Sequence, residues 1–348
     1  MSRYINIFEE CDTENYVFHI LQGARGGGKT YSMLTGLEGL IPSPYQHEEK
    51  YILMRRTQDE CDTIASDNGT MNPFKKINSD YNTDYNCKKI NRKTISIYDN
   101  SDYDGDPHGY IMALSTFAHV RGADFCDVDT IVVDEFVPER HVRAIPDEAN
   151  AYFNAYETVN RNREFDGKPP VQMFWLSNSN NIYNPLLSEL GIVNDIERLA
   201  KTTGYGKLRY PERSLEFILL DSSLEFKELK AQTAIGRLTA GTGYRAMALD
   251  NQYAFNDFSL TGYRKIKNAR PLFSVDNIYV YLGKDDIAYA CYAKGDVIDR
   301  YNSKNMHDQI AVARAWRAFF STHYINGRFY FETYEIKHIL LRMIMDIK

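Results

Sequence analysis

GARGGGKT, residues Gly23 to Thr30, fits the phosphate-binding pattern G-x-x-x-x-G-K-[ST] at every fixed position. The preceding residues 16–22, YVFHILQ, predict a buried strand, and the following residues 31–40, YSMLTGLEGL, predict the start of a helix. A strand, a glycine-rich loop and a helix in this order are the structural context that the pattern needs. The stretch therefore predicts a phosphate-binding loop, and a chance match in a glycine-rich turn is the weaker interpretation.

The residue types in this loop suit a nucleotide with magnesium. Glycines 26–28 let the backbone approach a phosphate without Cβ clashes, and the following helix adds the positive end of its dipole. We expect Lys29 to neutralise charge on the β- and γ-phosphates, and the Thr30 hydroxyl to hold Mg²⁺. The residues expected to contact ATP are Gly23, Ala24, Arg25, Gly26, Gly27, Gly28, Lys29, Thr30 and Tyr31.

Length and composition describe an ordinary globular protein. The 348 residues suit one large or two modest domains, and 43% of them are hydrophobic. The net charge of −6 argues against a uniformly basic nucleic-acid-binding surface, although it is compatible with a local basic patch. The five scattered cysteines suggest neither a disulfide framework nor a zinc site and fit a reducing cytosol. Neither a signal peptide nor a membrane span is expected.

Two carboxylates, Asp134 and Glu135, follow the apolar run 131–133 in DTIVVDEF. This pattern predicts a core strand of a parallel sheet with acids at its carboxyl end, where ligands bind in such folds. We expect Asp134 to bind Mg²⁺, and Glu135 to act as general base or to orient the attacking water. The separation of 105 residues from Lys29 (134 − 29) leaves room for extra strands. A Glu directly after the Asp is typical of the additional-strand class of P-loop ATPases.

Three polar residues further along the chain are candidates for contact with the γ-phosphate. Residues 171–176 predict a buried strand, and Asn178 just beyond it can sense that phosphate, with a plain Asn turn as the alternative. Residues 147–167 predict a helix that ends near Arg161 and Arg163. These arginines can act as fingers that reach the nucleotide of a neighbouring subunit, or they can be solvated cations at a helix end.

The remaining patterns divide the chain into three parts. Residues 1–222 are expected to form an α/β domain with a parallel-rich central sheet. Residues 223–256 are helical in pattern and are expected to form a small linker module. Residues 257–348 show three strands followed by helices, which predict an independent α+β domain. The additional strands expected in the first domain lie at residues 50–56, 93–100, 109–116 and 215–223, the last of them closing the sheet.

Several stretches, in this order, resemble the DNA-packaging ATPases of phi-twenty-nine-like tailed phages. They are GARGGGKTYSM, IVVDEF, RNRE, LSN followed by NP, and GRL…GT.Y..M.LDNQ. The resemblance covers most of residues 16–255 and is weaker beyond. The last stretch, which starts at Gly236, has no general nucleotide-binding role, so it is far more specific to this family than the ATPase motifs are.

The resemblance implies an activity and an assembly that the residues alone do not show. It implies a homomeric ring, typically of five subunits, that hydrolyses ATP to drive double-stranded DNA into a procapsid through the portal (connector) protein. It implies a C-terminal domain similar to RNase H-type nucleases without their catalytic set, binding nucleic acid or the portal. Some members dock through a structural packaging RNA. The expected location is the host cytoplasm, transiently at the portal vertex, and not the mature virion.

The resemblance also assigns residues between subunits and at the DNA. Arg161 matches the position of the trans-acting finger, and Arg121 matches a second basic position, where family members carry Lys. An arginine keeps the charge there but changes the geometry. Family members can carry a DNA-facing lysine just after the second strand, where this chain has residues 57–58, Thr-Gln. Lys75 or Lys76, or polar groups, would then have to contact DNA.

Two alternative functions stay open at this point. A large terminase that cuts DNA needs converging carboxylates in its C-terminal domain. Asp276, Asp299 and Asp308 are candidates by position, and ordinary acids in strand-end turns are the other interpretation. A nucleotide-gated portal adaptor would bind ATP without hydrolysing it, but the adjacent Asp134 and Glu135 argue against that function.

Overall fold

The chain is seen in a computed structural model that describes residues 4–45, 47, 49–65, 71–100, 105–138, 142, 145–178, 181–221, 224–242, 245, 253, 256–265 and 268–345. It forms two compact units. The first comprises Met1–Leu190 and Arg198–Phe255, and the second comprises Gly191–Glu197 and Asn256–Lys348. This division differs from the predicted one, because the contacts group the predicted linker with the first unit and assign residues 191–197 to the second.

The first unit is built on a nine-stranded sheet of order β3-β4-β5-β2-β6-β7-β1-β9-β8. The six strands from β5 to β9 in that order run parallel to their neighbours, which confirms the parallel-rich sheet. Strands β3, β4 and β8 are antiparallel, so β8 rather than the predicted β9 closes the sheet. In chain order the strands are β1 Phe18–Gly23, β2 Lys50–Arg55, β3 Tyr85–Lys89, β4 Thr94–Asp99, β5 Gly109–Ala113, β6 Val128–Asp134, β7 Gln172–Asn178, β8 Gly206–Tyr210 and β9 Leu215–Leu219.

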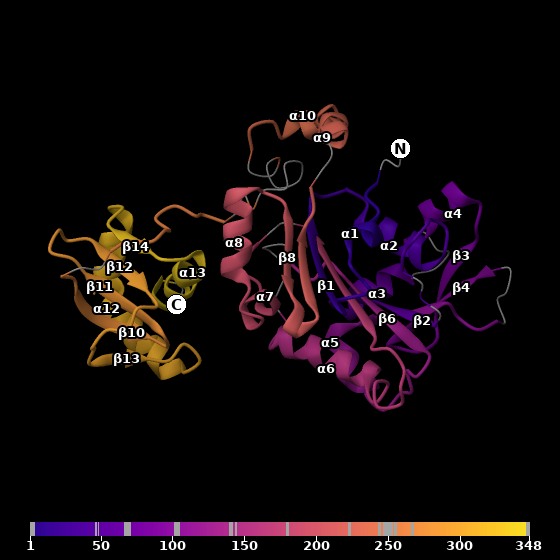
Figure 1. The fold of residues 1–348 in the computed structure, drawn as a ribbon, viewed down its shortest axis with the longest axis horizontal. Helices are drawn as coiled ribbons and strands as arrows, with labels where there is room; N and C mark the ends of the chain where they lie inside the picture. Colours follow the sequence, from indigo (N-terminus) through magenta and orange to yellow (C-terminus); the bar gives the residue numbers. More distant parts are fainter. Residues whose placement is uncertain are drawn as a thin grey trace. The chain divides into compact units, whose positions relative to one another are not determined.

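Helices cover both faces of this sheet (Figure 1). Side chains alternate across a strand, so Phe174 and Trp175 of β7 lie on opposite faces. Phe174 packs in a buried cluster with Phe8 and Met33, whereas Trp175 meets Tyr152 with ring centroids 6.1 Å apart. The helices of this unit are α1 Ile7–Glu10, α2 Lys29–Leu37, α3 Gln58–Ile64, α4 Lys75–Tyr81, α5 Leu114–Phe117, α6 Glu148–Asn160, α7 Pro185–Glu189, α9 Leu224–Ala231 and α10 Ala234–Leu238, with α8 Val193–Thr202 shared between the units.

The N-terminal residues contribute to the core of the first unit. Ile7 and Phe8 of α1 are fully buried in the cluster beneath α2. The Ile7 N–H donates to the Ser32 hydroxyl of α2 at 2.9 Å. A helix of four residues is too short to show a hydrophobic period, so the sequence pattern does not reveal it.

The second unit has a five-stranded sheet of order β13-β10-β11-β12-β14. Its helices α12 Met306–Ile325 and α13 Tyr334–Met345 share a buried cluster with the strands, and Phe273, Phe320 and Phe331 belong to that cluster. The short strand β14 pairs in parallel with β12 and is absent from the predicted pattern. The strands are β10 Arg270–Val275, β11 Ile278–Leu282, β12 Ala288–Cys291, β13 Asp299–Tyr301 and β14 Phe329–Phe331.

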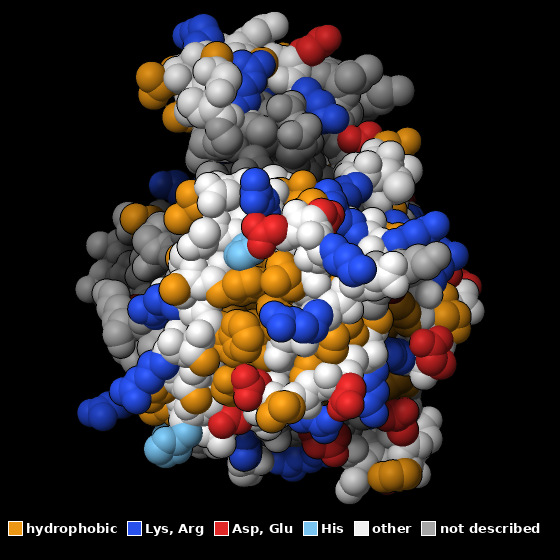
Figure 2. Space-filling model, turned by 90° about the vertical axis from the view of Figure 1, so that its left-hand side faces the viewer, with side chains coloured by type: hydrophobic (Ala, Val, Ile, Leu, Met, Phe, Trp, Pro, Cys, Tyr) orange, Lys and Arg blue, Asp and Glu red, His pale blue; other side chains and the backbone are white. Residues whose placement is uncertain are grey.

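The surface mixes apolar and charged side chains. Figure 2 shows one face on which hydrophobic side chains, tyrosines included, lie between lysine and arginine side chains. Scattered apolar exposure of this kind is normal for a globular protein. Within the described part of the chain, no helix is both long enough and apolar enough to cross a membrane.

Candidate active site

The carboxyl ends of three neighbouring strands, β6, β7 and β1, meet at one edge of the first sheet. Parallel strands that end together bring together the residues that follow them. The site is a cavity of about 190 Å³. It is lined by Arg25, Gly26, Gly28, Lys29, Thr30, Tyr31, Asp134, Glu135, Ser177 and Asn178.

The glycine loop has the backbone that only glycine adopts easily. Gly26 and Gly28 have φ angles of 79° and 88°, in the left-handed region. Gly28 is the residue from which α2 begins, so the N–H groups of the first turn of α2 lie at the cavity. The loop therefore offers backbone donors and a helix N-terminus to an anion.

Lys29 is a buried cation that forms no ion pair with a carboxylate among the residues that the structure describes. Its Nζ donates to the carbonyls of Gly23 at 3.1 Å and Ala24 at 2.9 Å, and to Asn178 Oδ1 at 3.2 Å. Burial lowers the pKa of Lys29 to about 8, although the Asp134 and Glu135 carboxylates raise it in part. A phosphate group would supply the negative charge that the three uncharged acceptors do not.

Thr30, at the start of α2, is in contact with Asp134, the last residue of β6. The Thr30 hydroxyl donates to Asp134 Oδ1 at 2.9 Å. A hydroxyl and a carboxylate are the hard oxygen ligands that Mg²⁺ prefers beside phosphates, so these residues fit the predicted metal site. When bound, the ion would neutralise phosphate charge.

Arg55 is a site residue whose role the sequence did not reveal. Its Nη1 lies 2.5 Å from Asp134 Oδ2, and its Nη2 lies 3.4 Å from Glu135 Oε2. β2 is the neighbour of β6, so its last residue reaches the acids at the end of β6. Strand order would have been needed to find this pair. The adjacent Arg56 is structural, with Nε 2.7 Å from Glu148 Oε1 in a buried ion pair.

Glu135 lines the cavity at the end of β6. It directly follows β6, and its backbone has a φ angle of 59°, which is rare for a residue other than glycine. Such strain is retained where the surrounding structure fixes a functional residue. Its side chain is 56% exposed at the cavity, so a water molecule can reach the carboxylate.

Asn178 lies where the sequence predicts a phosphate sensor, in contact with Lys29. The residue before it, Ser177, accepts a hydrogen bond from Gln22 Nε2 at 3.1 Å. Gln22 in turn accepts from the buried Tyr253 hydroxyl. The end of β7 is thus held by a buried network that reaches into the segment after α10.

Arg121 and Arg161 lie together and away from the glycine loop. Arg161 Nη2 donates to the Arg121 carbonyl at 2.9 Å, and its Nε donates to the Thr158 carbonyl at 3.1 Å. Both arginines are exposed. Arg163, two residues on, reaches the carbonyl of Val128 at the start of β6. The cavity at the glycine loop lies at the other end of β6. A strand of seven residues is roughly 20 Å long, so Arg163 is far from that cavity.

The contacts of Arg163 favour a structural role over the expected role as a finger. It is only 6% exposed, and its Nη1 lies 2.7 Å from Glu49 Oε2. The same nitrogen donates to the carbonyls of Cys126 and Val128, both at 3.1 Å. An arginine with these buried partners cannot swing to another subunit without leaving them unsatisfied.

Three of the residues considered for DNA contact, Thr57, Gln58 and Lys76, have local partners. Thr57 accepts from the Glu60 N–H and caps the N-terminus of α3, and Gln58 donates to Asp62 at 3.1 Å. Lys76 lies 2.8 Å from Asp80, one helical turn away. None of these contacts assigns a DNA site.

Two of the three acids considered for a nuclease site, Asp276 and Asp308, serve the local fold. Asp276 accepts from the Ser303 N–H at 3.0 Å, and Asp308 accepts from the Asn302 N–H at 2.8 Å. Asp276 itself has a φ angle of 50°, in the turn between β10 and β11. These contacts favour turn acids over metal ligands for both residues.

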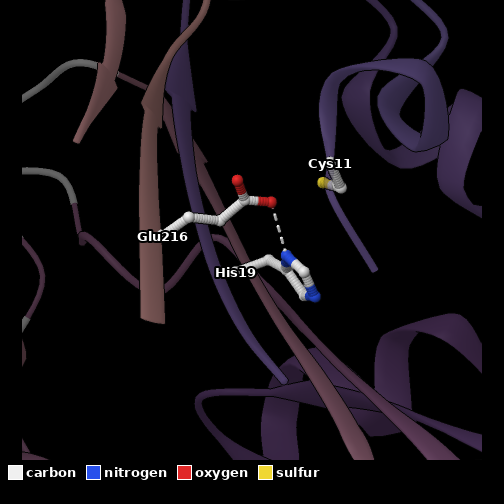
Figure 3. A group of neighbouring side chains, drawn as sticks. All are labelled: Cys11, His19 and Glu216. Atoms are coloured by element: carbon white, nitrogen blue, oxygen red, sulfur yellow. Dashed lines mark hydrogen bonds and ion pairs between the residues drawn. The ribbon is translucent and has the colours of Figure 1, made fainter. Parts of the chain in front are cut away.

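A buried group formed by Cys11, His19 and Glu216 lies at the opposite end of β1 (Figure 3). Their possible ligand atoms lie within 4.8 Å of one another. His19 Nδ1 is 2.8 Å from Glu216 Oε1, and its Nε2 is 2.8 Å from Gln172 Oε1. Burial, and then the Glu216 charge, raises the pKa of the Cys11 thiol well above its usual value. The Asp12 N–H also donates to Glu216 Oε1 at 2.8 Å, so these hydrogen bonds tie the end of α1 to β1 and β9.

A larger cavity, of about 660 Å³, lies at the amino ends of β2 and β6. Its charged groups pair with one another. Lys50 lies 2.7 Å from Asp127, and His108 lies 2.7 Å from Glu38, whose carboxylate raises the pKa of the imidazole. Because these charges are already matched, the cavity is a weaker candidate for an anionic ligand than the one at the glycine loop.

Comparisons with known proteins show which proteins this chain is similar to. The chain matches the family model described as Podovirus DNA encapsidation protein (Gp16) over residues 2–302. A protein of Bacillus phage B103 called DNA packaging protein is 29% identical over 261 residues, which is 74% of this chain and 71% of that protein. Its counterpart of the same name in Bacillus phage phi29 is 28% identical, over 74% of this chain and 68% of that protein.

A solved structure has the same fold. It is described as "The bacteriophage Phi-29 viral genome packaging motor assembly" and aligns with a TM-score of 0.65 and 22% identity, over 99% of this chain and 100% of that chain. The family model spans well over half of the sequence. The chain therefore belongs to the podovirus DNA encapsidation protein (Gp16) family.

Proposed function

We propose that this chain is the ATPase subunit of a viral genome-packaging motor. In this proposal a homomeric ring, five-membered as in the family, couples ATP hydrolysis to movement of double-stranded DNA through the portal into a procapsid. The observation that carries the proposal is the contact of 2.9 Å between Thr30 and Asp134, with Glu135 directly beside it. Family membership and the relatives named DNA packaging proteins support the same function.

In this proposal each residue of the site has a separate role in ATP hydrolysis. Lys29 binds the β- and γ-phosphates, and Thr30 with Asp134 would hold Mg²⁺. Glu135 accepts a proton from the attacking water or orients it. Asn178 contacts Lys29 and reports the presence of the γ-phosphate to the end of β7. Arg55 must leave Asp134 when the metal binds, because it lies against that carboxylate.

The sheet supports the additional-strand class of P-loop ATPases. In this class an extra strand separates the strand before the phosphate loop from the strand that carries the acidic pair. Here β7 lies between β1 and β6 and pairs in parallel with both. Glu135 after Asp134 fits the same class.

Arg121 and Arg161 are proposed to act on the nucleotide of a neighbouring subunit. They lie toward the end of β6 that is remote from their own glycine loop, so action within one chain would require a large rearrangement. Both are exposed. In a ring, an exposed basic loop can face the site of the next subunit and stabilise charge in the transition state.

The second unit is proposed to be a vestigial RNase H-like domain that binds nucleic acid or the portal, with a structural packaging RNA as a further possible partner. The hydrogen bonds of Asp276 and Asp308 support the loss of a nuclease site. Residues 223–256 are proposed to transmit the difference between the ATP-bound and ATP-free states of the site to this domain. The motor would work in the host cytoplasm, at the portal vertex, only while DNA enters.

The test is Glu135→Gln, measured for ATP binding and for ATP hydrolysis with DNA and portal present. Binding should persist, and hydrolysis should fall by about 100-fold or more, because the general base is lost. Hydrolysis at the wild-type rate would refute the role of Glu135. A wild-type protein that binds ATP but never hydrolyses it would favour a portal adaptor, and metal-dependent nicking of DNA would favour a large terminase.

A further inference from the structure

A lysine from the predicted linker lies against the phosphate loop. A Cβ atom built on Gly26 would lie 2.6 Å from Lys230 Nζ. Lys230 belongs to the last turn of α9, in the same compact unit as the loop. Its ammonium therefore occupies the space that a side chain at Gly26 would need, beside a residue that lines the nucleotide cavity.

The position of Lys230 is fixed by a tight corner between α9 and α10, which lie side by side in Figure 1. The N–H and hydroxyl of Thr233 donate to the Lys230 carbonyl at 3.1 and 2.6 Å. A Cβ on Gly236 would lie 2.2 Å from that carbonyl oxygen and 2.9 Å from the Ala231 oxygen. Only glycine permits this close approach of the two helices.

The corner gives a physical reason for part of the GRL…GT.Y..M.LDNQ stretch, which the ATPase motifs leave unexplained. Gly236 is its first residue, and its role is to let α10 pack on the end of α9. Most of the stretch after Thr242 lies outside the described residues. Within the described part of the stretch, Gly236 determines the position of Lys230 through the corner between α9 and α10.

The charge of Lys230 is available for a ligand. Its helix neighbour Lys227 lies 3.3 Å from the Asp221 carboxylate. Among the residues that the structure describes, Lys230 has no carboxylate partner. The acids of the cavity are already engaged, since Asp134 meets Thr30 and Arg55.

We propose that Lys230 binds a phosphate of the nucleoside di- or triphosphate held in the same chain, so that α9 becomes part of the nucleotide site. This inference rests on the proposed function, because it requires the glycine loop to bind a nucleotide. A lysine side chain supplies a mobile point charge that can form a charge-assisted hydrogen bond to a phosphate oxygen. While a phosphate is bound at the glycine loop, its contact with Lys230 holds α9 in position. When the phosphate leaves, that contact is lost and α9 is less constrained.

The experiment compares Lys230→Met with Lys227→Met in the full-length chain, using a fluorescent ADP analogue and unlabelled ADP and ATP in competition. Lys230→Met should weaken binding about tenfold, the loss expected for one charge-assisted hydrogen bond. Lys227→Met removes a charge from the same helix and should leave binding within about twofold. Lys230→Arg, which keeps the charge, should recover most of the affinity.

Hydrogen exchange of the α9 amides provides a second measurement that a merely structural lysine would not affect. ADP should slow exchange over Leu224–Ala231 in the wild type and in Lys227→Met, but not in Lys230→Met. Gly236→Ala should reproduce the loss, because its Cβ displaces the corner that positions Lys230, although the lysine itself is retained.

Two outcomes separate this inference from the function on which it rests. Failure of the wild type to bind ADP or ATP would overturn the proposed function itself. A wild type that binds nucleotide, with Lys230→Met equal to it in affinity and in protection of α9, would overturn only the role of Lys230.

Discussion

Among the described residues, each unit of the molecule contains one buried lysine, and the two differ in what surrounds them. Lys29 in the first unit is 9% exposed and Lys337 in the second is 1% exposed. Lys29 donates only to uncharged oxygens, beside an open cavity. Lys337 Nζ lies 2.7 Å from Asp257 Oδ2 and donates to the carbonyl of Ser259 at 2.8 Å.

The difference separates a binding group from a structural one. Partial burial alone would raise the pKa of Asp257, but hydrogen bonds from Lys337 and Ser259 hold it at about 2, so this carboxylate neutralises Lys337. Within the described part of the chain, Lys29 has no such ion-pair partner, and burial lowers its pKa to about 8. A buried cation without an anion, next to a cavity, is what a phosphate-binding site requires.

The largest effect should come from Lys29→Met. We expect ATP affinity to fall by about 100-fold, roughly 3 kcal/mol, because charge-assisted hydrogen bonds to two phosphates are lost. The free energy of unfolding should not fall, since an unpaired buried cation is removed. Binding titrations and urea unfolding of the same preparations test this prediction. A large loss of stability with intact ATP binding would show that Lys29 is a structural group rather than a binding group.

Lys337→Met should give the opposite pattern with a smaller effect. We expect the second unit to lose about 2 kcal/mol of unfolding free energy, because the ion pair and carbonyl contacts are lost while Asp257 stays solvated. ATP affinity should equal that of the wild type. Thermal unfolding with and without ATP measures both quantities. The contrast would fail if Lys337→Met weakened ATP binding as strongly as Lys29→Met.

The pH dependence of ATP binding sharpens the comparison further. The protonated form of Lys29 binds phosphate, and its pKa in the free protein is about 8. Above that pH, binding must take up a proton, so affinity should fall by up to about tenfold per pH unit. Below pH 7 the Lys29 contribution should be constant. Titrations between pH 7 and pH 9.5 check the slope, with circular dichroism at each pH to confirm folding.

The sequence could predict the site where one short motif or one strand end defines it. Lys29, Thr30, Asp134 and Glu135 lie together because a glycine loop and an apolar strand with terminal acids each carry a local pattern. The parallel-rich sheet follows from the same apolar strands.

The rest depended on which elements become neighbours. Arg55 joins the site because β2 pairs with β6, and Arg163 is buried because it returns to the start of β6. Lys230 reaches the loop through a corner that needs Gly236. These contacts cannot be inferred from the spacing of residues in the sequence. The elements α1 and β14 are also too short to show a hydrophobic period.

The central claim is that the site of one chain is completed by a neighbour. The most direct test measures ATP hydrolysis per chain against protein concentration, with and without double-stranded DNA, for the wild type, Arg161→Ala and Arg121→Ala. The account predicts that wild-type activity per chain rises with concentration, increases further with DNA, and collapses in both variants. Activity per chain that is independent of concentration, indifferent to DNA and unchanged in the variants would contradict it.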